Sequence, residues 1–180
     1  ELVNSKSILQ HVIDNIKACN SISKIIVATS NQQDDDETEN LCKKLNVIPF
    51  RGDLNDVASR FYKIIKKYNA DFFLRINADS PLIDPNLISY FIDHYKKGNN
   101  DIITNVLERT YPKGQSIEIF NSKAFLKGYE KLNTIDEKEH VTTFFYNNSD
   151  KYKILNIKND VSYSEVNLSV DTDQDLKKIR

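Results

Sequence analysis

Apolar runs and amphipathic segments alternate over the first 100 residues, and this alternation constrains the fold more than any other feature of the sequence. Three β-branched or aromatic runs are too short for helices and predict buried strands at 24–29, 47–50 and 71–76. Segments with apolar residues every three or four positions predict helices at 7–20, 34–46, 56–68 and 84–97. Such alternation with short connections predicts parallel strands that are covered by helices on both faces.

The second half of the chain is less regular but remains mixed. It predicts strands at 101–106, 116–120, 153–157 and 166–170, and helices at 122–132, 140–147 and 173–180. The run 116–120 alternates like a strand with one polar face. With 4 Gly and 4 Pro in 180 residues there is no linker composition, so we expect one domain over residues 1–180. Right-handed crossovers then place a ligand site at the carboxyl ends of the strands.

Charge and composition exclude several classes of protein. Lys+Arg 25 against Asp+Glu 26 gives a net charge of −1, which is not the footprint of a nucleic-acid or membrane-surface partner. No apolar run approaches the roughly 20 residues that a membrane span needs. Two cysteines, Cys19 and Cys42, are too few for a disulfide framework, so we expect a reduced, cytoplasmic protein.

Two aspartates stand directly after predicted strands. Asp79 stands at the end of the strand that begins with the run 71–76, and Ser80-Pro81 then turns the chain out of the strand. Asp171 directly follows the run 166–170. Two carboxylates at strand ends are a plausible seat for Mg²⁺ shared with substrate phosphates. Asp79 could equally make only a local Asx-turn. Asp173 suits the cap of the last helix, which leaves Asp171 outside that helix.

Other strand ends carry small or polar residues. Thr29-Ser30-Asn31 follows the first strand and Arg51-Gly52-Asp53 the second, and such loops let a backbone approach a flat ligand. The tripeptide 51–53 also spells an integrin-binding motif, a match more easily explained by chance. His140 begins the predicted helix 140–147, where a cap and an active-site contact are equally good interpretations.

Taken as a set, several motifs resemble the cytidylyltransferase-like family of spore-coat polysaccharide biosynthesis, which is related to the CMP-Kdo and CMP-sialic acid synthetases. In the first half they are Ile25-Ile-Val-Ala-Thr-Ser30, Phe50-Arg-Gly-Asp-Leu-Asn-Asp-Val57, Arg60-Phe-Tyr62 and Arg75-Ile-Asn-Ala-Asp-Ser-Pro-Leu-Ile-Asp84. In the second half they are Arg109-Thr-Tyr-Pro-Lys-Gly114, Glu118-Ile-Phe120, Glu139-His-Val-Thr142 and Val170-Asp-Thr172. The resemblance covers nearly the whole chain.

The resemblance implies a Rossmann-like nucleotide-diphospho-sugar transferase fold, with three αβα layers and a mainly parallel mixed sheet. It also implies an enzyme that transfers CMP from CTP to an acidic or phosphorylated sugar with Mg²⁺ and releases pyrophosphate. Asp79 and Asp171 fall on the catalytic, metal-binding carboxylates. The positions that it implies for the nucleotide are Ala28, Thr29, Ser30, Arg51, Gly52 and Asn77. Those that it implies for the acceptor sugar are Arg75, Tyr111, Glu118 and His140.

Two departures from the family pattern shape these expectations. The family opens with a strand and a phosphate-binding loop that would precede the first residue here, so we expect the sheet to lack its usual first strand. Ser116 stands where the family usually has an aspartate. The alternative functions are a non-catalytic nucleotide- or sugar-binding module and a nucleotide-sugar-dependent glycosyltransferase. Aromatic residues between Arg109 and Tyr146 suggest either a homodimer interface or a satellite core.

Overall fold

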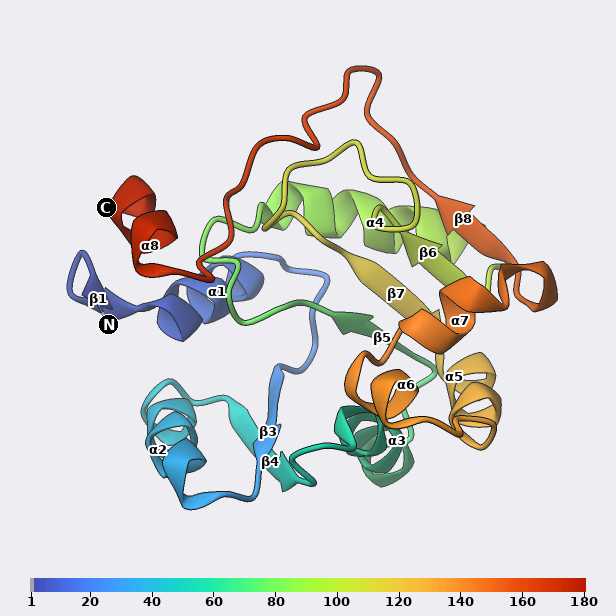
Figure 1. The fold of residues 1–180 in the computed structure, drawn as a ribbon, viewed down its shortest axis with the longest axis horizontal. Helices are drawn as coiled ribbons and strands as arrows, with labels where there is room; N and C mark the ends of the chain where they lie inside the picture. The colour runs from blue at the N-terminus through green and yellow to red at the C-terminus, as the bar shows by residue number, and fades with distance from the viewer. Residues whose placement is uncertain (1) are drawn as a thin grey trace. The chain divides into compact units, whose positions relative to one another are not determined.

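The computed structural model describes residues 2–180, which divide into two compact units (Figure 1). Unit 1 comprises residues 2–23 with Leu74–Ile119 and Ile154–Arg180, and unit 2 comprises Lys24–Phe73 and Phe120–Lys153. The boundaries fall inside strands β5 (Phe72–Arg75) and β7 (Glu118–Asn121). The elements are α-helices and β-strands in mixed order, which confirms the predicted α/β class. A single domain over residues 1–180 stays a prediction.

Unit 1 holds the ends of β5 and β7 and the elements β1 (Leu2–Val3), β2 (Lys6–Ser7), α1 (Ile8–Lys17), α4 (Pro85–Lys97), β6 (Ile102–Thr104), β8 (Ile154–Asn156) and α8 (Asp173–Ile179). The four-stranded sheet has the order β5-β7-β6-β8, and β6 pairs with β8 in parallel. Strands β1 and β2 form a separate antiparallel pair. The helices begin where the sequence predicts, because Ser7 caps α1 and Asp84 caps α4 ahead of Pro85.

Unit 2 holds the elements β3 (Ile26–Ser30), η1 (Gln33–Asp35), α2 (Asp36–Lys44), β4 (Ile48–Gly52), α3 (Val57–Tyr68), α5 (Ser122–Tyr129), α6 (Ile135–Glu139), α7 (Thr143–Asn147) and η2 (Ser149–Lys151). Strands β3 and β4 pair in parallel, with Ile26 opposite Ile48 and Ser30 opposite Gly52. Asp56 caps α3 as predicted, since its carboxylate accepts the Ser59 N–H. The paired strands therefore end together, at Ser30 and Gly52.

The core of unit 2 is aromatic. Phe120, Phe125 and Phe145 are fully buried, and their ring centroids lie 5.1–5.6 Å apart. A Cβ on Gly128 would lie 2.4 Å from the Phe145 ring, so only glycine lets α5 approach this closely. These rings belong to a core within one chain, which accounts for much of the aromatic content of residues 109–146. The homodimer stays a prediction.

The predicted strand 166–170 is wrong. Within this segment only Asn167 forms a β-bridge, which is parallel and isolated, with Lys113. The cause is Gly114, whose φ of 87° turns the partner chain away after one pair. Further along the same segment, the Val170 N–H donates to the Asp79 carbonyl and not to a neighbouring strand.

Three local predictions also need correction. The strand β7 has no solvent-facing polar side at Glu118, which is buried. His140 ends α6 and does not begin a helix, and a capping box between Thr134 and Glu137 starts α6. Thr172, and not Asp173, caps α8. At α6 and α8 a hydrogen bond from a backbone N–H to a threonine side chain marks where the helix starts.

Within residues 2–180, no helix is long and apolar enough to cross a membrane. The strands of the described residues lie in three sheets, whereas the sequence predicts one continuous sheet. The pairings of β3 with β4 and of β6 with β8 are parallel.

Candidate active site

The two predicted metal-binding aspartates come together in unit 1. Asp79 follows β5 and lies in a turn, and Asp171 lies just before α8. Their segments are joined through the backbone, because the Val170 N–H donates to the Asp79 carbonyl over 2.8 Å. We call Asp79 and Asp171 the aspartate pair. Residues that are 92 positions apart in the sequence are thus held by neighbouring peptide groups.

Each carboxylate of the aspartate pair is oriented by a serine beside it. Ser80 Oγ donates to Asp79 Oδ1 over 2.8 Å, and Ser169 Oγ shares its hydrogen between Asn167 Oδ1 (2.7 Å) and Asp171 Oδ2 (3.1 Å). Both serines are buried, whereas Asp79 is half-buried and Asp171 exposed. The second carboxylate oxygen of each aspartate accepts no hydrogen bond from residues 2–180. One oxygen of each is thereby fixed and the other is left available.

The buried side chain of Gln115 fixes the segment that follows Asp79. Its Nε2 donates to the Leu82 carbonyl over 2.6 Å, and its Oε1 accepts the Asp84 N–H over 3.0 Å. Asn105, also buried, holds the Gln115 backbone by donating from Nδ2 to its carbonyl over 2.8 Å. Both side-chain amides use their donor and acceptor ends, as burial requires.

Gly114 brings the same loop against the segment that precedes Asp171. A Cβ on Gly114 would lie 2.6 Å from the Leu168 carbonyl carbon, so the backbones touch. Lys113 adds two hydrogen bonds, from its N–H to the Val166 carbonyl and from the Leu168 N–H to its own carbonyl. The loop 113–115 therefore contacts both segments that carry the aspartate pair.

Two of the predicted acceptor-binding residues pair with each other. Arg75 Nη1 donates to Glu118 Oε2, and the Glu118 side chain is 2% exposed against 24% for Arg75. A buried carboxylate requires such a partner, because desolvation of an unpaired charge is costly. Arg75 is therefore the more accessible member of this pair.

The other predicted residues of unit 1 lie on the loops. Asn77, two residues before Asp79, is half-buried. The half-buried Tyr111 ring packs edge-to-face against the Phe91 ring, with 6.4 Å between the ring centroids. Burial raises the pKa of the Tyr111 hydroxyl. Tyr111 thus belongs partly to the core of unit 1.

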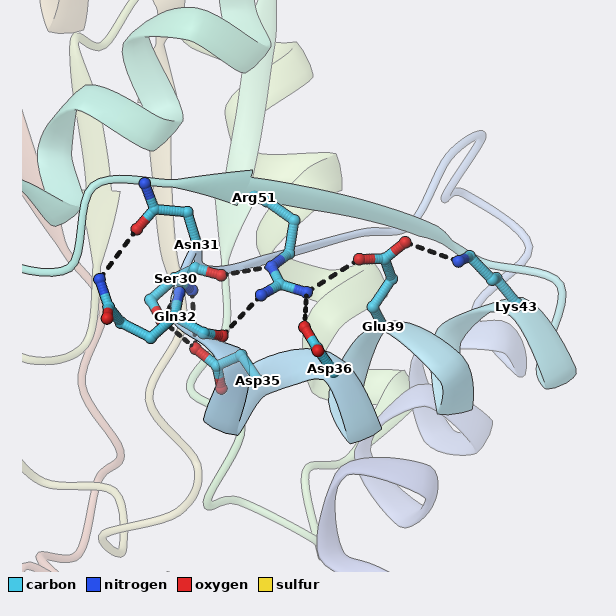
Figure 2. Close-up of polar contacts among 8 residues, drawn as sticks. All are labelled: Ser30, Asn31, Gln32, Asp35, Asp36, Glu39, Lys43 and Arg51. Carbon is cyan, nitrogen blue, oxygen red and sulfur yellow. Dashed lines mark hydrogen bonds and ion pairs between the residues drawn. The ribbon is translucent and has the colours of Figure 1, made fainter.

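The predicted nucleotide-binding residues of unit 2 gather at the ends of β3 and β4 (Figure 2). Arg51 donates to the carbonyls of Ser30 and Gln32 and pairs with Asp36 (2.9 Å) and Glu39 (2.8 Å) on α2. The hydrogen bond to Asp36 raises the pKa of Arg51 further. We call residues 30–39 with Arg51 the Arg51 loop. All three nitrogens of this guanidinium are occupied within the chain.

Ser30 and Asp35 close the other side of the Arg51 loop. Asp35 Oδ2 accepts both the Ser30 hydroxyl and the Ser30 N–H, the latter over 2.9 Å. The hydroxyl hydrogen bond lowers the pKa of Asp35 below its usual 3.8, although partial burial opposes the shift and Thr29 assists it. Ser30 is 2% exposed, so its side chain serves the loop and not the solvent.

Arg60, quoted only as part of a family motif, lies beneath these strand ends. It is buried and donates to the carbonyls of Ala28, Asp53 and Leu54. Gly52 allows this, since a Cβ there would lie 2.8 Å from Arg60 Cγ. The glycine is explained by the passage of this arginine as well as by any ligand.

His140 stands apart from the groups above within unit 2. Its Nε2 lies 3.5 Å from Asp136 one turn earlier on α6, and both side chains are more than 60% exposed. Its N–H donates to the Asp136 carbonyl. Its position is that of a surface C-cap.

The donor set of the aspartate pair fits a hard divalent cation that is shared with a ligand. Two carboxylates with free oxygens are the usual protein share for Mg²⁺, which keeps waters and substrate phosphates as its other ligands. Among residues 2–180 no group of three or more His, Cys, Asp or Glu could hold a metal. A cage made entirely of protein ligands, as in structural zinc sites, is therefore absent from the described chain.

The sequence did not predict a role for Gln115, Asn105 or Arg60. Gln115 lies between predicted elements and Asn105 near the end of the predicted strand 101–106, and amide side chains are ordinarily exposed. Their burial was signalled only by the glycine at 114 and by the apolar residues on either side. The charged Arg60 on the apolar face of α3 was the clearer sign, because such a residue needs internal partners.

The fold is that of a nucleotidyltransferase. A cytidylyltransferase family model matches residues 1–179, and the chain belongs to this cytidylyltransferase family. It is therefore a nucleotidyltransferase enzyme that uses CTP.

Two relatives match most of the chain. The uncharacterized protein MJ1063 of Methanocaldococcus jannaschii is 29% identical over 97% of this chain and 72% of its own length. The spore coat polysaccharide biosynthesis protein SpsF of Bacillus subtilis is 27% identical over 87% of this chain and 65% of its own length. The chain thus spans about two thirds to three quarters of these relatives.

Solved structures share the fold. A cytidylyltransferase from Leptospira borgpetersenii has a TM-score of 0.95 at 28% identity, over 99% of this chain and 76% of that one. A CMP:2-keto-3-deoxy-manno-octonic acid synthetase complexed with CTP has a TM-score of 0.72 at 14% identity, over 99% of this chain and 88% of that one. The second likeness concerns the fold alone.

Proposed function

We propose that the protein transfers CMP from CTP to an acidic or phosphorylated sugar, with release of pyrophosphate, for surface polysaccharide biosynthesis. The observation that carries the proposal is the aspartate pair, held together by the Val170–Asp79 hydrogen bond in a chain of the cytidylyltransferase family. The name of the relative SpsF supports the pathway. The buried free thiols of Cys19 and Cys42 support a reducing compartment, and we place the protein in the cytoplasm.

Asp79 and Asp171 would hold Mg²⁺ through the carboxylate oxygens that the serines leave free. When bound, the ion would supply positive charge that offsets the negative charge developing at the α-phosphate and on the leaving pyrophosphate. The chain contributes position. Ser80, Ser169 and the Gln115 contacts restrict both carboxylates before the substrate arrives, which lowers the entropic cost of assembly.

The other predicted site residues fall into a group for the nucleotide and a group for the acceptor sugar. For the nucleotide we propose, in unit 2, the backbone of Ala28, Thr29 and Ser30, ordered by Arg51 and Gly52, and, in unit 1, Asn77. In this proposal Arg51 acts by fixing the loop, because its guanidinium is already occupied. For the acceptor we propose, in unit 1, Arg75, oriented by Glu118, and Tyr111, and, in unit 2, His140.

The test measures pyrophosphate release and ligand-dependent melting. With Mg²⁺, CTP should raise the melting temperature more than UTP or GTP, because a ligand that binds only the folded state stabilises it by mass action. Pyrophosphate should then appear only when a carboxylated or phosphorylated sugar is added. Stabilisation by CTP that is equal with and without a divalent ion would contradict the metal assignment. Hydrolysis or transfer from a nucleotide sugar in place of CTP would favour the glycosyltransferase alternative.

A further inference from the structure

Arg109 and Ser116 in unit 1 form a pair whose hydrogen bonds are only half used. Nη1 and Nη2 of Arg109 lie 3.2 and 3.1 Å from Ser116 Oγ, so the hydroxyl accepts two N–H groups. Both residues are half-buried, and solvent can therefore reach the pair. A guanidinium carries five N–H donors, of which this geometry occupies two.

No carboxylate compensates the charge of this guanidinium. Among residues 2–180, no ion pair within 4.0 Å involves Arg109. Its sequence neighbour Glu108 pairs with Lys158 instead. Arg51 and Arg75, by contrast, each hold a carboxylate. Arg109 thus keeps a full positive charge at a partly desolvated position.

The Ser116 hydroxyl adds a further donor at the same place. Because its oxygen accepts from Arg109, its own hydrogen points elsewhere, and no acceptor for it lies among the described residues. The pair therefore offers N–H and O–H donors together and no free acceptor. Carboxylate and phosphate oxygens are the groups that such a set binds best, since charge-assisted hydrogen bonds are about twice as strong as neutral ones.

The pair is connected to the segment that carries Asp79. Ser116 directly follows Gln115, whose side chain bonds the backbone at Leu82 and Asp84. It lies two residues before Glu118, the partner of Arg75. A ligand group held at Ser116 is thus attached to the same loop that positions the aspartate pair.

We propose that Arg109 and Ser116 form an oxyanion site that binds the carboxylate or phosphate of the acceptor sugar. The identity of the anion rests on the proposed function, whereas the oxyanion site itself does not. The position at 116 then determines acceptor class, because an aspartate there would neutralise Arg109 and remove the anion site. Ser116 leaves the guanidinium free for the substrate.

The test compares Ser116→Asp with the neutral isostere Ser116→Asn. Orthophosphate and D-glucuronate are titrated calorimetrically into the whole protein with Mg²⁺ and saturating α,β-methylene-CTP, which keeps the nucleotide site filled. We expect Ser116→Asp to weaken binding of both anions at least about tenfold, and to weaken it more than Ser116→Asn, because the asparagine amide still supplies an N–H donor and adds no negative charge beside Arg109. Arg109→Gln should match Ser116→Asp, and it decides the question if the aspartate variant does not fold.

Other outcomes are equally informative. Unchanged anion affinity in both Ser116→Asp and Arg109→Gln would overturn the site. Loss of α,β-methylene-CTP affinity in these variants, with phosphate binding intact, would assign Arg109 to the nucleotide and overturn the acceptor role. If the unaltered protein binds no CTP but its phosphate affinity still depends on residue 116, the proposed function fails and the oxyanion site stands.

Discussion

The aspartate pair of unit 1 and the Arg51 loop of unit 2 are both clusters of charged side chains, yet they use charge in opposite ways. In the Arg51 loop the guanidinium holds two carboxylates and two carbonyls, so its charge is spent on the chain itself. In the aspartate pair each carboxylate accepts one serine hydroxyl and keeps an oxygen free. Charged groups that are compensated internally stabilise structure, and those that are left incomplete are available to a ligand.

The largest expected effect follows loss of charge in the aspartate pair. Asp79→Asn and Asp171→Asn should each reduce CMP transfer on the order of 100-fold or more, because a metal ligand worth several kcal/mol in the transition state is lost. Asparagine can still accept the serine hydroxyl, and one negative charge fewer reduces repulsion. The melting temperature without ligand should therefore be unchanged or slightly higher. Unaltered Mg²⁺-dependent CTP affinity in both variants would remove the aspartate pair from the site.

An intermediate effect is expected at Gln115. Gln115→Leu leaves the Leu82 carbonyl and the Asp84 N–H without their side-chain partner, at a cost of about 0.5–1.5 kcal/mol for each hydrogen bond lost. The Asp79 segment should then be displaced, and the Mg²⁺ concentration that gives half-maximal transfer should rise more than KM for CTP does. Gln115→Glu is the matched control, because it retains an acceptor for Asp84 and loses only the donor to Leu82. An equal loss of activity at all Mg²⁺ concentrations would argue against a positioning role.

At Arg51 we expect a change in stability that exceeds any change in chemistry. Arg51→Met removes the contacts that join β4 to α2 and to the Ser30 carbonyl, so the melting temperature should fall by a few degrees. Lys43→Met serves as a comparison, since Lys43 pairs only with Glu39 and is mostly exposed. If Arg51 contacts CTP directly, Arg51→Met will instead lose CTP affinity at an unchanged melting temperature.

The smallest expected effect concerns pH at Asp35. Its pKa in the folded state lies below 3.8, so its ionised form stabilises the fold above that pH. This stabilisation is lost as the pH falls below 3.8 and through the folded pKa. The difference in urea midpoint between the unaltered protein and Asp35→Asn should therefore be constant near neutral pH and shrink in acid. A difference that grows in acid would have the wrong sign for this carboxylate.

The local sequence was sufficient for the helix starts and for the strands of the first half. Ser7, Asp56 and Asp84 each stand at the first residue of a predicted helix and cap α1, α3 and α4, because a cap depends only on residues within one turn. The runs at 26–30, 48–52 and 72–75 are strands for a similar reason, since their apolar content permits burial on both faces. Asp79 and Asp171 could be selected as candidate metal ligands from the sequence, because each is a carboxylate that follows a predicted strand.

Only the tertiary structure decided which polar groups are occupied. The spacing of Arg75 and Glu118, or of Arg51 and Glu39, does not predict that these charges form ion pairs. The residues of each pair lie on different elements, which only the tertiary structure brings together. The strand expected at 166–170 became a bridge and a bond to Asp79 because Gly114 redirected its partner. Sequence periodicity reports burial along one segment, whereas hydrogen-bond satisfaction is a property of all segments packed together.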